Sequence, residues 1–180
     1  HSPEKILSSG ALVDSPEKPG RAETRLQSSI APGLEPVIPE VCGLEPIAAV
    51  HTARYLAFLE NIHTRWLRIP DASKDVLPNV HPDSRRCLYP ASAVGQVGYH
   101  VFDGAAPITS DTWNSALWSA YSAVQAAREV MCGARACYAL ARPPGHHATK
   151  DMAGGFCYLN NSAIAAQELR SQHERVAILD

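Results

Sequence analysis

Two adjacent histidines, His146 and His147, follow the stretch Arg-Pro-Pro-Gly and are the residues in this sequence best suited to chemistry. Imidazole is the side chain whose ordinary pKa lies near neutrality, which suits proton transfer. Side chains that follow each other on a regular strand point to opposite sides, but the prolines and Gly145 favour a loop in which both rings can face one cleft. The pair therefore predicts a proton-transfer site, the alternative being a surface histidine pair.

Two further features near the histidines suit a binding site. Paired glycines beside aromatic residues, Gly154-Gly155-Phe156-Cys157-Tyr158, permit close backbone approach to a ligand with a ring to line its channel. An ordinary turn entering a helix explains them equally well. Asp180 is a carboxylate of the type that accepts the second N–H of a catalytic imidazole, the alternative being a solvated chain end.

Short apolar runs precede both candidates and predict buried strands. Residues 137–142 (CYALAR) lead into the histidines, and residues 175–180 (RVAILD) end in Asp180, with a helix expected at about 160–172 between them. Strand, loop, helix and strand in this order indicate a parallel βαβ unit and an α/β fold. In an open α/β sheet the ligand site lies beyond the carboxyl ends of the strands, where both candidates stand.

Other helices are expected at about 51–67, capped by Thr52, and at about 112–132, bounded by Asp111 or Thr112 and by Gly133. The first has an apolar stripe: Tyr55, Leu56, Leu59, Ile62, Trp66 and Leu67. Prolines predict a surface loop over residues 1–45, broken by one short helix at about 21–30. Residues 69–111 also read as a loop, and an ordered loop of this length usually has a binding or oligomer function.

The composition fits a globular chain of 180 residues with one core, because 46% of the residues are hydrophobic and 19% charged. Sixteen basic and eighteen acidic side chains give a net charge of -2, which argues against nucleic acid as a partner. The sequence has neither a membrane-length apolar run nor the apolar core of a signal peptide. Five scattered cysteines favour a reducing, cytoplasmic setting without disulfides.

The string ARPPGHHATKDMAGGFCYLNNSAIAAQ followed by RVAILD resembles the histone deacetylase superfamily, specifically its bacterial acetylpolyamine amidohydrolase-like branch. The resemblance covers nearly all of the chain and includes these strings: SPEKPGRAE, AAVHTARYLAFLE, PNVHPDSRRCLYPASAVGQVGYHVFD and APITSDTWNSALWSA. It implies a zinc-dependent amidohydrolase with an arginase/deacetylase-like α/β fold, a parallel sheet flanked by helices. Residues 1–180 are then expected to be the N-terminal portion of a single deacetylase domain, truncated after the strand that ends at Asp180.

The resemblance also implies roles for the chemical residues. His147 matches the general base that later protonates the leaving amine, and His146 matches its electrostatic and orienting partner. Asp180 matches the carboxylate that hydrogen-bonds His146 and also helps hold a structural potassium ion. In relatives the zinc ligands and an oxyanion-site tyrosine follow the position of Asp180, so no zinc ligand is expected within this chain.

Three further positions match the family's substrate path. Gly155 and Phe156 match the channel wall around the acyl chain, and Asp103 more loosely matches an acid at the channel rim. Arg21 matches the arginine of an internal acetate-release channel. The loop over residues 79–102 matches the segment through which acetylpolyamine-type relatives form homodimers.

The resemblance implies a hydrolase that removes acetyl groups from acetylated polyamines or other small acetylated amines. The alternatives are a protein or histone lysine deacetylase and a non-catalytic, truncated interaction protein. Because the implied zinc ligands are absent, residues 1–180 alone are expected to be inactive.

Overall fold

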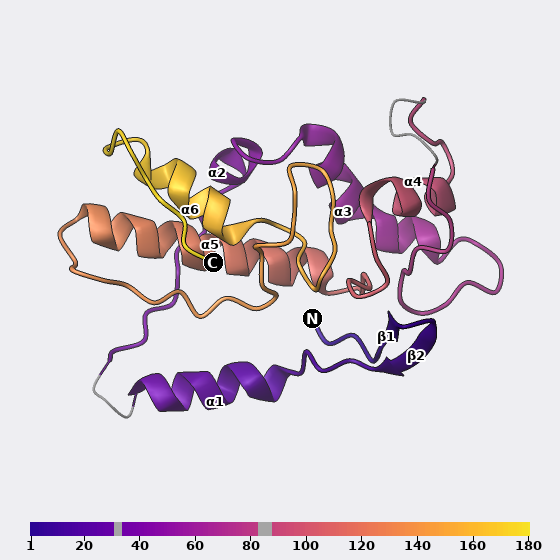
Figure 1. The fold of residues 1–180 in the computed structure, drawn as a ribbon, viewed down its shortest axis with the longest axis horizontal. Coiled ribbons are helices and arrows are strands. Elements are labelled where there is room, and N and C mark those ends of the chain that lie inside the picture. Colours follow the sequence, from indigo (N-terminus) through magenta and orange to yellow (C-terminus); the bar gives the residue numbers. More distant parts are fainter. Residues whose placement is uncertain (31–33, 83–87) are drawn as a thin grey trace.

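The elements of the computed structural model surround the long helix α5 (Figure 1). The structure describes residues 1–30, 34–82 and 88–180; Cys87 and residues 83–87 of the expected dimer loop lie outside the described residues. In chain order the elements are β1 (Lys5–Ser8), β2 (Ala11–Asp14), α1 (Pro19–Ile30), α2 (Glu45–Ala48), α3 (Ala53–Trp66), α4 (Ala93–His100), α5 (Thr112–Met131) and α6 (Asn161–Leu169). The segment between α5 and the histidines runs between α5 and α1.

One hydrophobic core joins helices α2 to α6 to the loop that carries the histidines. Helix α5 packs against α6, and α3 packs against α4. The expected stripe of α3 is buried in this core, except that Leu67, just past the last turn, is 53% exposed. Tyr158, Leu159 and Ile164 enter the same core from the segment after the histidines. The loop is therefore anchored to the core on its C-terminal side.

The helix ends follow the sequence expectations closely. Thr52 caps α3 by accepting a hydrogen bond from the N–H of Tyr55, and Asn160 caps α6 by accepting one from Ala163. Gly133 follows α5 with φ +108°, a positive value that favours glycine after a helix. Asp111 occupies the position before α5 but makes no capping bond with its side chain. The predicted cap Thr52 and the predicted Gly133 after α5 are thus confirmed in their roles.

The prediction of an irregular segment over residues 1–45 is wrong for β1 and β2, which form an antiparallel hairpin. Lys5 pairs with Asp14 and Ser8 with Ala11, so Ser9 and Gly10 alone form the turn. Both turn residues have positive φ, 50° and 80°, as a two-residue type I′ turn requires.

The prediction that residues 69–111 lack a helix is also wrong, because α4 lies within this range. Its glycines, Gly95 and Gly98, favour a loop on sequence grounds. A Cβ added at Gly98 would lie 1.7 Å from the carbonyl oxygen of Val80, so this glycine lets the helix pack directly on a neighbouring backbone. Gly98 therefore serves close packing and not a turn.

The two predicted strands are not hydrogen-bonded as strands within the described residues. Residues 137–142 and 175–180 carry no strand assignment. A strand needs a neighbour for its ladder of hydrogen bonds, and the hairpin β1–β2 is the sheet that the described residues form. Tyr138 is 58% exposed and Leu179 96% exposed, so both runs present apolar side chains that a flanking strand or helix would cover.

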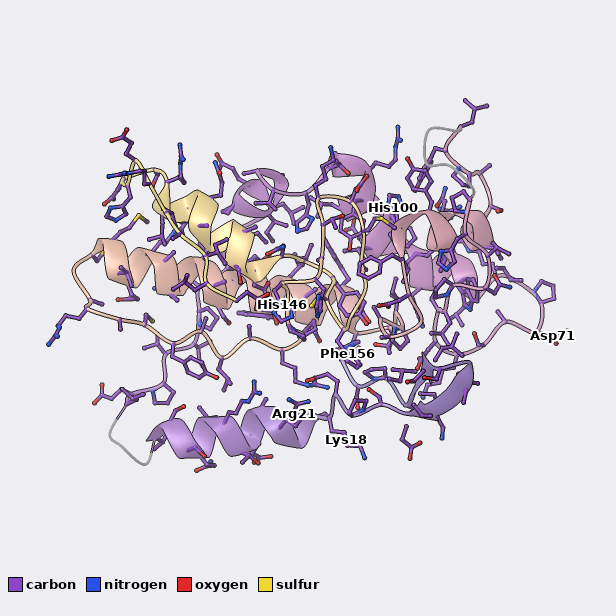
Figure 2. All side chains as sticks on the ribbon, viewed as in Figure 1. Lys18, Arg21, Asp71, His100, His146 and Phe156 are labelled. Atoms are coloured by element: carbon purple, nitrogen blue, oxygen red, sulfur yellow. The ribbon has the colours of Figure 1, made fainter. Side chains whose placement is uncertain are left out.

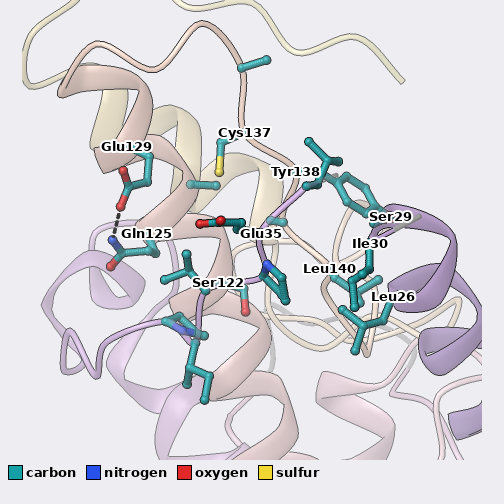
Figure 3. A pocket seen from close by; sticks show the side chains of 18 residues that line it. Leu26, Ser29, Ile30, Glu35, Ser122, Gln125, Glu129, Cys137, Tyr138 and Leu140 are labelled. Carbon is teal, nitrogen blue, oxygen red and sulfur yellow. Dashed lines mark hydrogen bonds between the residues drawn. The ribbon is translucent and has the colours of Figure 1, made fainter. Parts of the chain in front are cut away.

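Two hollows flank residues 137–141. The larger, about 710 Å³, lies between α1, residues 34–39 and α5, with Leu26, Ile30 and Leu140 in its wall (Figure 3). On its α5 side Gln125 donates a hydrogen bond of 2.8 Å to Glu129. The smaller hollow, about 460 Å³, reaches Gly145 and His146. The smaller hollow is thus the one that borders the histidine pair.

Candidate functional site

A tight turn from Gly145 to Ala148 carries the two histidines at its corner. The N–H of Ala148 donates to the carbonyl of Gly145 at 3.0 Å, which closes the turn. A Cβ added at Gly145 would lie 2.4 Å from the backbone nitrogen of Asn161, so only glycine fits there. The rings of His146 and His147 lie edge to face with centroids 4.2 Å apart. The loop thus brings both imidazoles to one place, as a regular strand would not.

A second tight turn, from Gly154 to Cys157, lies against the first. The N–H of each of these two residues donates to the carbonyl of the other. The corner residues Gly155 and Phe156 have φ of +54° and +68°, the left-handed region that a residue with a side chain rarely adopts. Strain at a non-glycine residue such as Phe156 persists where the surroundings fix the backbone, and such residues cluster at functional sites.

The two turns touch through His147 and Gly155. A Cβ added at Gly155 would lie 2.5 Å from Cδ2 and 2.9 Å from Cγ of His147. The missing side chain of Gly155 therefore leaves the space that the His147 ring occupies. Phe156, which follows Gly155, is half-buried, and Figure 2 places His146 and Phe156 in the central part of the view.

Asp103 fixes the second turn. One carboxylate oxygen accepts the N–H of Gly155 at 2.9 Å, and the other accepts the N–H of Ala105 at 2.9 Å. Charge-assisted bonds of this kind hold a backbone firmly. Each carboxylate oxygen has a second lone pair, so Asp103 keeps acceptor capacity for a ligand. Its role as a rim acid stays a prediction.

Asp180 lies beside His146 but holds it loosely. Its Oδ1 lies 3.5 Å from Nδ1 of His146, and the two side chains are 72% and 44% exposed. An ion pair this exposed contributes little to stability. The structure brings together the carboxylate and imidazole that the sequence pairs, and the potassium role of Asp180 stays a prediction.

Arg21 stands apart from the histidines, on α1 (Figure 2). Its guanidinium lies 3.4 Å from one carboxylate oxygen of Glu17, whose other oxygen accepts a hydrogen bond from Arg142 at 2.8 Å. Arg142 also donates to the carbonyls of His1 and Glu17, and it directly precedes Pro143. Glu17 and Arg142, which the sequence reading missed, therefore link α1 to the start of the histidine loop.

Two buried tyrosines, Tyr55 and Tyr158, hold backbone carbonyl groups near the site through their hydroxyls. The hydroxyl of Tyr158 donates to the carbonyl of Pro107 at 2.6 Å, and the hydroxyl of Tyr55 donates to the carbonyl of Tyr158 at 2.6 Å. Complete burial raises the pKa of both phenols well above its ordinary value, so both remain hydrogen-bond donors. Burial likewise raises the pKa of the Cys157 thiol, which donates to the carbonyl of Gly155 at 3.4 Å.

His51 lies just before α3, and the sequence alone predicts no role for it beyond the start of the helix expected at about 51–67. It is 2% exposed, and burial lowers the pKa of its imidazole below the ordinary value of 6.5. Its Nδ1 lies 3.2 Å from the carbonyl of Lys150, and its Nε2 accepts the N–H of Asn160 at 2.9 Å. The ring is therefore neutral and bridges Lys150 and Asn160, the two ends of the segment that contains the second turn.

This burial predicts a dependence of stability on pH. The folded-state pKa of His51 is depressed, so the unfolded chain binds the proton first as the pH falls below about 6.5. The free energy of unfolding should then fall by at most about 1.4 kcal/mol for each pH unit, and it should not depend on His51 above that pH. Urea unfolding of the full-length protein between about pH 8 and 5 measures this. His51→Gln should flatten the slope; a variant that keeps the wild-type slope would contradict the assignment.

Across residues 1–30, 34–82 and 88–180, no three His, Cys, Asp or Glu side chains gather closely enough to hold a metal ion. The same described residues contain no helix long and apolar enough to cross a membrane.

Comparison with known proteins places the chain. A family profile described as the histone deacetylase domain matches residues 15–180. An acetylpolyamine amidohydrolase of Burkholderia pseudomallei (strain 1710b) is 45% identical over 181 residues, covering 100% of this chain and 52% of that protein. Acetylpolyamine amidohydrolase 2 of Pseudomonas aeruginosa is 44% identical over 167 residues, covering 91% and 48%. The chain thus spans about half the length of these curated relatives.

Solved structures agree with this match. The crystal structure of acetylpolyamine aminohydrolase from Burkholderia pseudomallei superposes with a TM-score of 0.94 at 44% identity, covering 97% of this chain and 51% of that one. The HDA15 HD domain, at 21% identity and a TM-score of 0.64, covers 95% and 41% and shares the fold. These matches confirm the arginase/deacetylase-like α/β fold class, although residues 137–142 and 175–180 lack strand pairing here. The chain belongs to the histone deacetylase family.

Proposed function

We propose that this chain carries the histidine half of the active site of a deacetylase that acts on acetylated polyamines or other small acetylated amines. The observation that carries the proposal is the contact of two turns. The first turn sets the rings of His146 and His147 side by side, and Gly155 of the second turn leaves the space that the His147 ring occupies. The relatives named acetylpolyamine amidohydrolase support the substrate class.

In the proposed reaction His147 acts as a general base. It takes a proton from water as the water oxygen bonds to the acetyl carbon, and it then gives the proton to the amine nitrogen as the C–N bond breaks. The products are acetate and a free amine. His146, whose ring lies against that of His147, orients it and stabilises the charge that it gains.

The family implies zinc, which in such hydrolases polarises the carbonyl and activates water. The described residues of this chain offer no ligand set for it, so no step is assigned to zinc here. We propose that its ligands lie outside this sequence. Residues 1–180 alone are accordingly expected to release no acetate.

Acetate release by the full-length protein tests the proposal. N-acetylputrescine and an acetyl-lysine histone peptide should be compared at equal concentrations, with residues 1–180 alone as the control. We expect release from N-acetylputrescine at the higher kcat/KM. A preference for the peptide would indicate a protein lysine deacetylase, and no release from either would favour a non-catalytic interaction protein.

We further propose that the full-length protein is a homodimer through the loop over residues 79–102. Within its described part, Gly98 packs on the backbone of Val80, and Tyr89 contacts His100 and Tyr99, so these described residues pack together as one unit. Light scattering should give a dimer for the wild type and a monomer after deletion of the loop tip. A wild-type monomer would contradict the proposal.

A further inference from the structure

Two buried histidines hold consecutive carbonyl groups of the loop between the two turns. Nδ1 of His51 lies 3.2 Å from the carbonyl oxygen of Lys150, and Nδ1 of His100 lies 2.7 Å from that of Asp151. His51 precedes α3 and is 2% exposed; His100 ends α4 and is 1% exposed. Two separate helices thus fix one point of the loop, and we call His51 and His100 the carbonyl clamp.

The hydrogen bonds of His51 define its tautomer. The N–H of Asn160 can only donate, so Nε2 of His51, 2.9 Å away, is the unprotonated nitrogen. Nδ1 therefore carries the proton and donates to Lys150. The N–H of Thr52 donates to the same carbonyl at 3.0 Å. Both ring nitrogens of His51 are used, one at each end of the segment from Lys150 to Asn160 that follows the histidines.

Asn160 extends this connection to the catalytic candidates. Its Nδ2 donates to the carbonyl of Ala148 at 2.7 Å and reaches the carbonyl of His146 at 3.5 Å. Its Oδ1 meanwhile caps α6 by accepting the N–H of Ala163 at 2.9 Å. The path from His51 through Asn160 ends on the residues on either side of His147.

We propose that His51 is a positioning residue for the His146–His147 pair, acting through Asn160 and the carbonyl of Lys150. The proposal rests on the proposed function, because it concerns the geometry of the same two imidazoles. The pair itself is exposed and its contact with Asp180 is long, so its position depends on the backbone beneath it. A shift of about 1 Å in such a backbone can cost roughly 100-fold in rate.

Steady-state kinetics of the full-length protein on N-acetylputrescine distinguish positioning from a purely structural role. His51→Phe keeps a ring but removes both hydrogen bonds, and it should lower kcat by about 10- to 100-fold with KM changed by less than about 3-fold. His51→Gln supplies a donor and an acceptor and should recover most of kcat. Ile62→Ala, at a buried position on α3, is the control: it should lower the melting temperature and leave kcat unchanged.

A second variant covers the case in which His51→Phe does not fold. Asn160→Asp keeps the oxygen that caps α6 but replaces the amide donor to Ala148 with a second oxygen. It should show the same loss of kcat. If the effects of Asn160→Asp and His51→Phe act on one path, their combination should cost less than the product of the single losses.

Amide hydrogen exchange of the full-length protein gives a readout that needs no activity. The N–H groups of Ala148 and Thr149 are hydrogen-bonded within the loop and should exchange faster in His51→Phe than in Ile62→Ala. Unchanged exchange, a kcat equal to that of Ile62→Ala, or a His51→Gln variant no better than His51→Phe would each overturn the proposal. A wild-type protein that releases no acetate would refute the proposed function, while the exchange experiment would still test the clamp.

Discussion

His147→Ala should lower kcat of the full-length protein on N-acetylputrescine by about 100- to 10,000-fold, the usual cost of losing a general acid-base group. His147 is exposed and contacts Gly155 and the ring of His146, so the free energy of unfolding should change little when its side chain is removed. Initial rates of acetate release and a thermal melt measure the two quantities.

The exposed His173, which follows α6, gives the matched control for this substitution. His173→Ala removes another exposed imidazole, outside the two turns, and should keep wild-type kcat. Near-normal turnover in His147→Ala would remove His147 from the mechanism.

Gly155→Ala should reduce kcat by roughly 100-fold while the protein remains folded. The added methyl would lie 2.5 Å from Cδ2 of His147, so the imidazole must move to make room for it. The left-handed backbone at Gly155, φ +54°, adds a stability cost of about 1–2 kcal/mol for a residue with a side chain. Kinetics and urea unfolding separate the two effects.

Gly10→Ala is the matched control for the backbone cost. Gly10 also has positive φ, +80°, and a Cβ added there meets no heavy atom of the described residues within 4 Å. It should lose similar stability in the β1–β2 turn with unchanged kcat. Equal kcat in the two glycine variants would show that the contact of Gly155 with His147 has no part in catalysis.

The sequence predicts well the parts of the fold that local rules decide. The stripe of α3, its Thr52 cap and the Asn160 cap of α6 follow from periodicity and capping chemistry, and all three are present. The β1–β2 hairpin could not be predicted from the sequence, because its strands are short and almost wholly exposed and so lack the alternation that marks a half-buried strand. Helix α4 could not be predicted either, because Gly98 favours a loop in the sequence and its actual role, close packing on Val80, depends on tertiary structure.

The candidate site divides in the same way. His146, His147 and Gly155 could be found from residue type and spacing, because their chemistry is visible in the sequence. His51, His100 and Asn160 could not, because their significance lies in hydrogen bonds to backbone groups. The hydrogen bond from His51 to Lys150 joins residues 99 positions apart, and the one from His100 to Asp151 joins residues 51 positions apart. In the sequence alone, a histidine at the start of a helix shows no feature that distinguishes it from an ordinary helix residue.

The most direct test of the account is a crystal structure of the full-length His147→Ala protein with N-acetylputrescine bound. Loss of the base should let intact substrate accumulate in the site. We expect the acetamide group of the substrate to lie beside position 147, within hydrogen-bond reach of His146 and bordered by Gly155 and Phe156. Substrate bound elsewhere, with the two turns facing away from it, would contradict the central claim that these turns form the proton-transfer half of the active site.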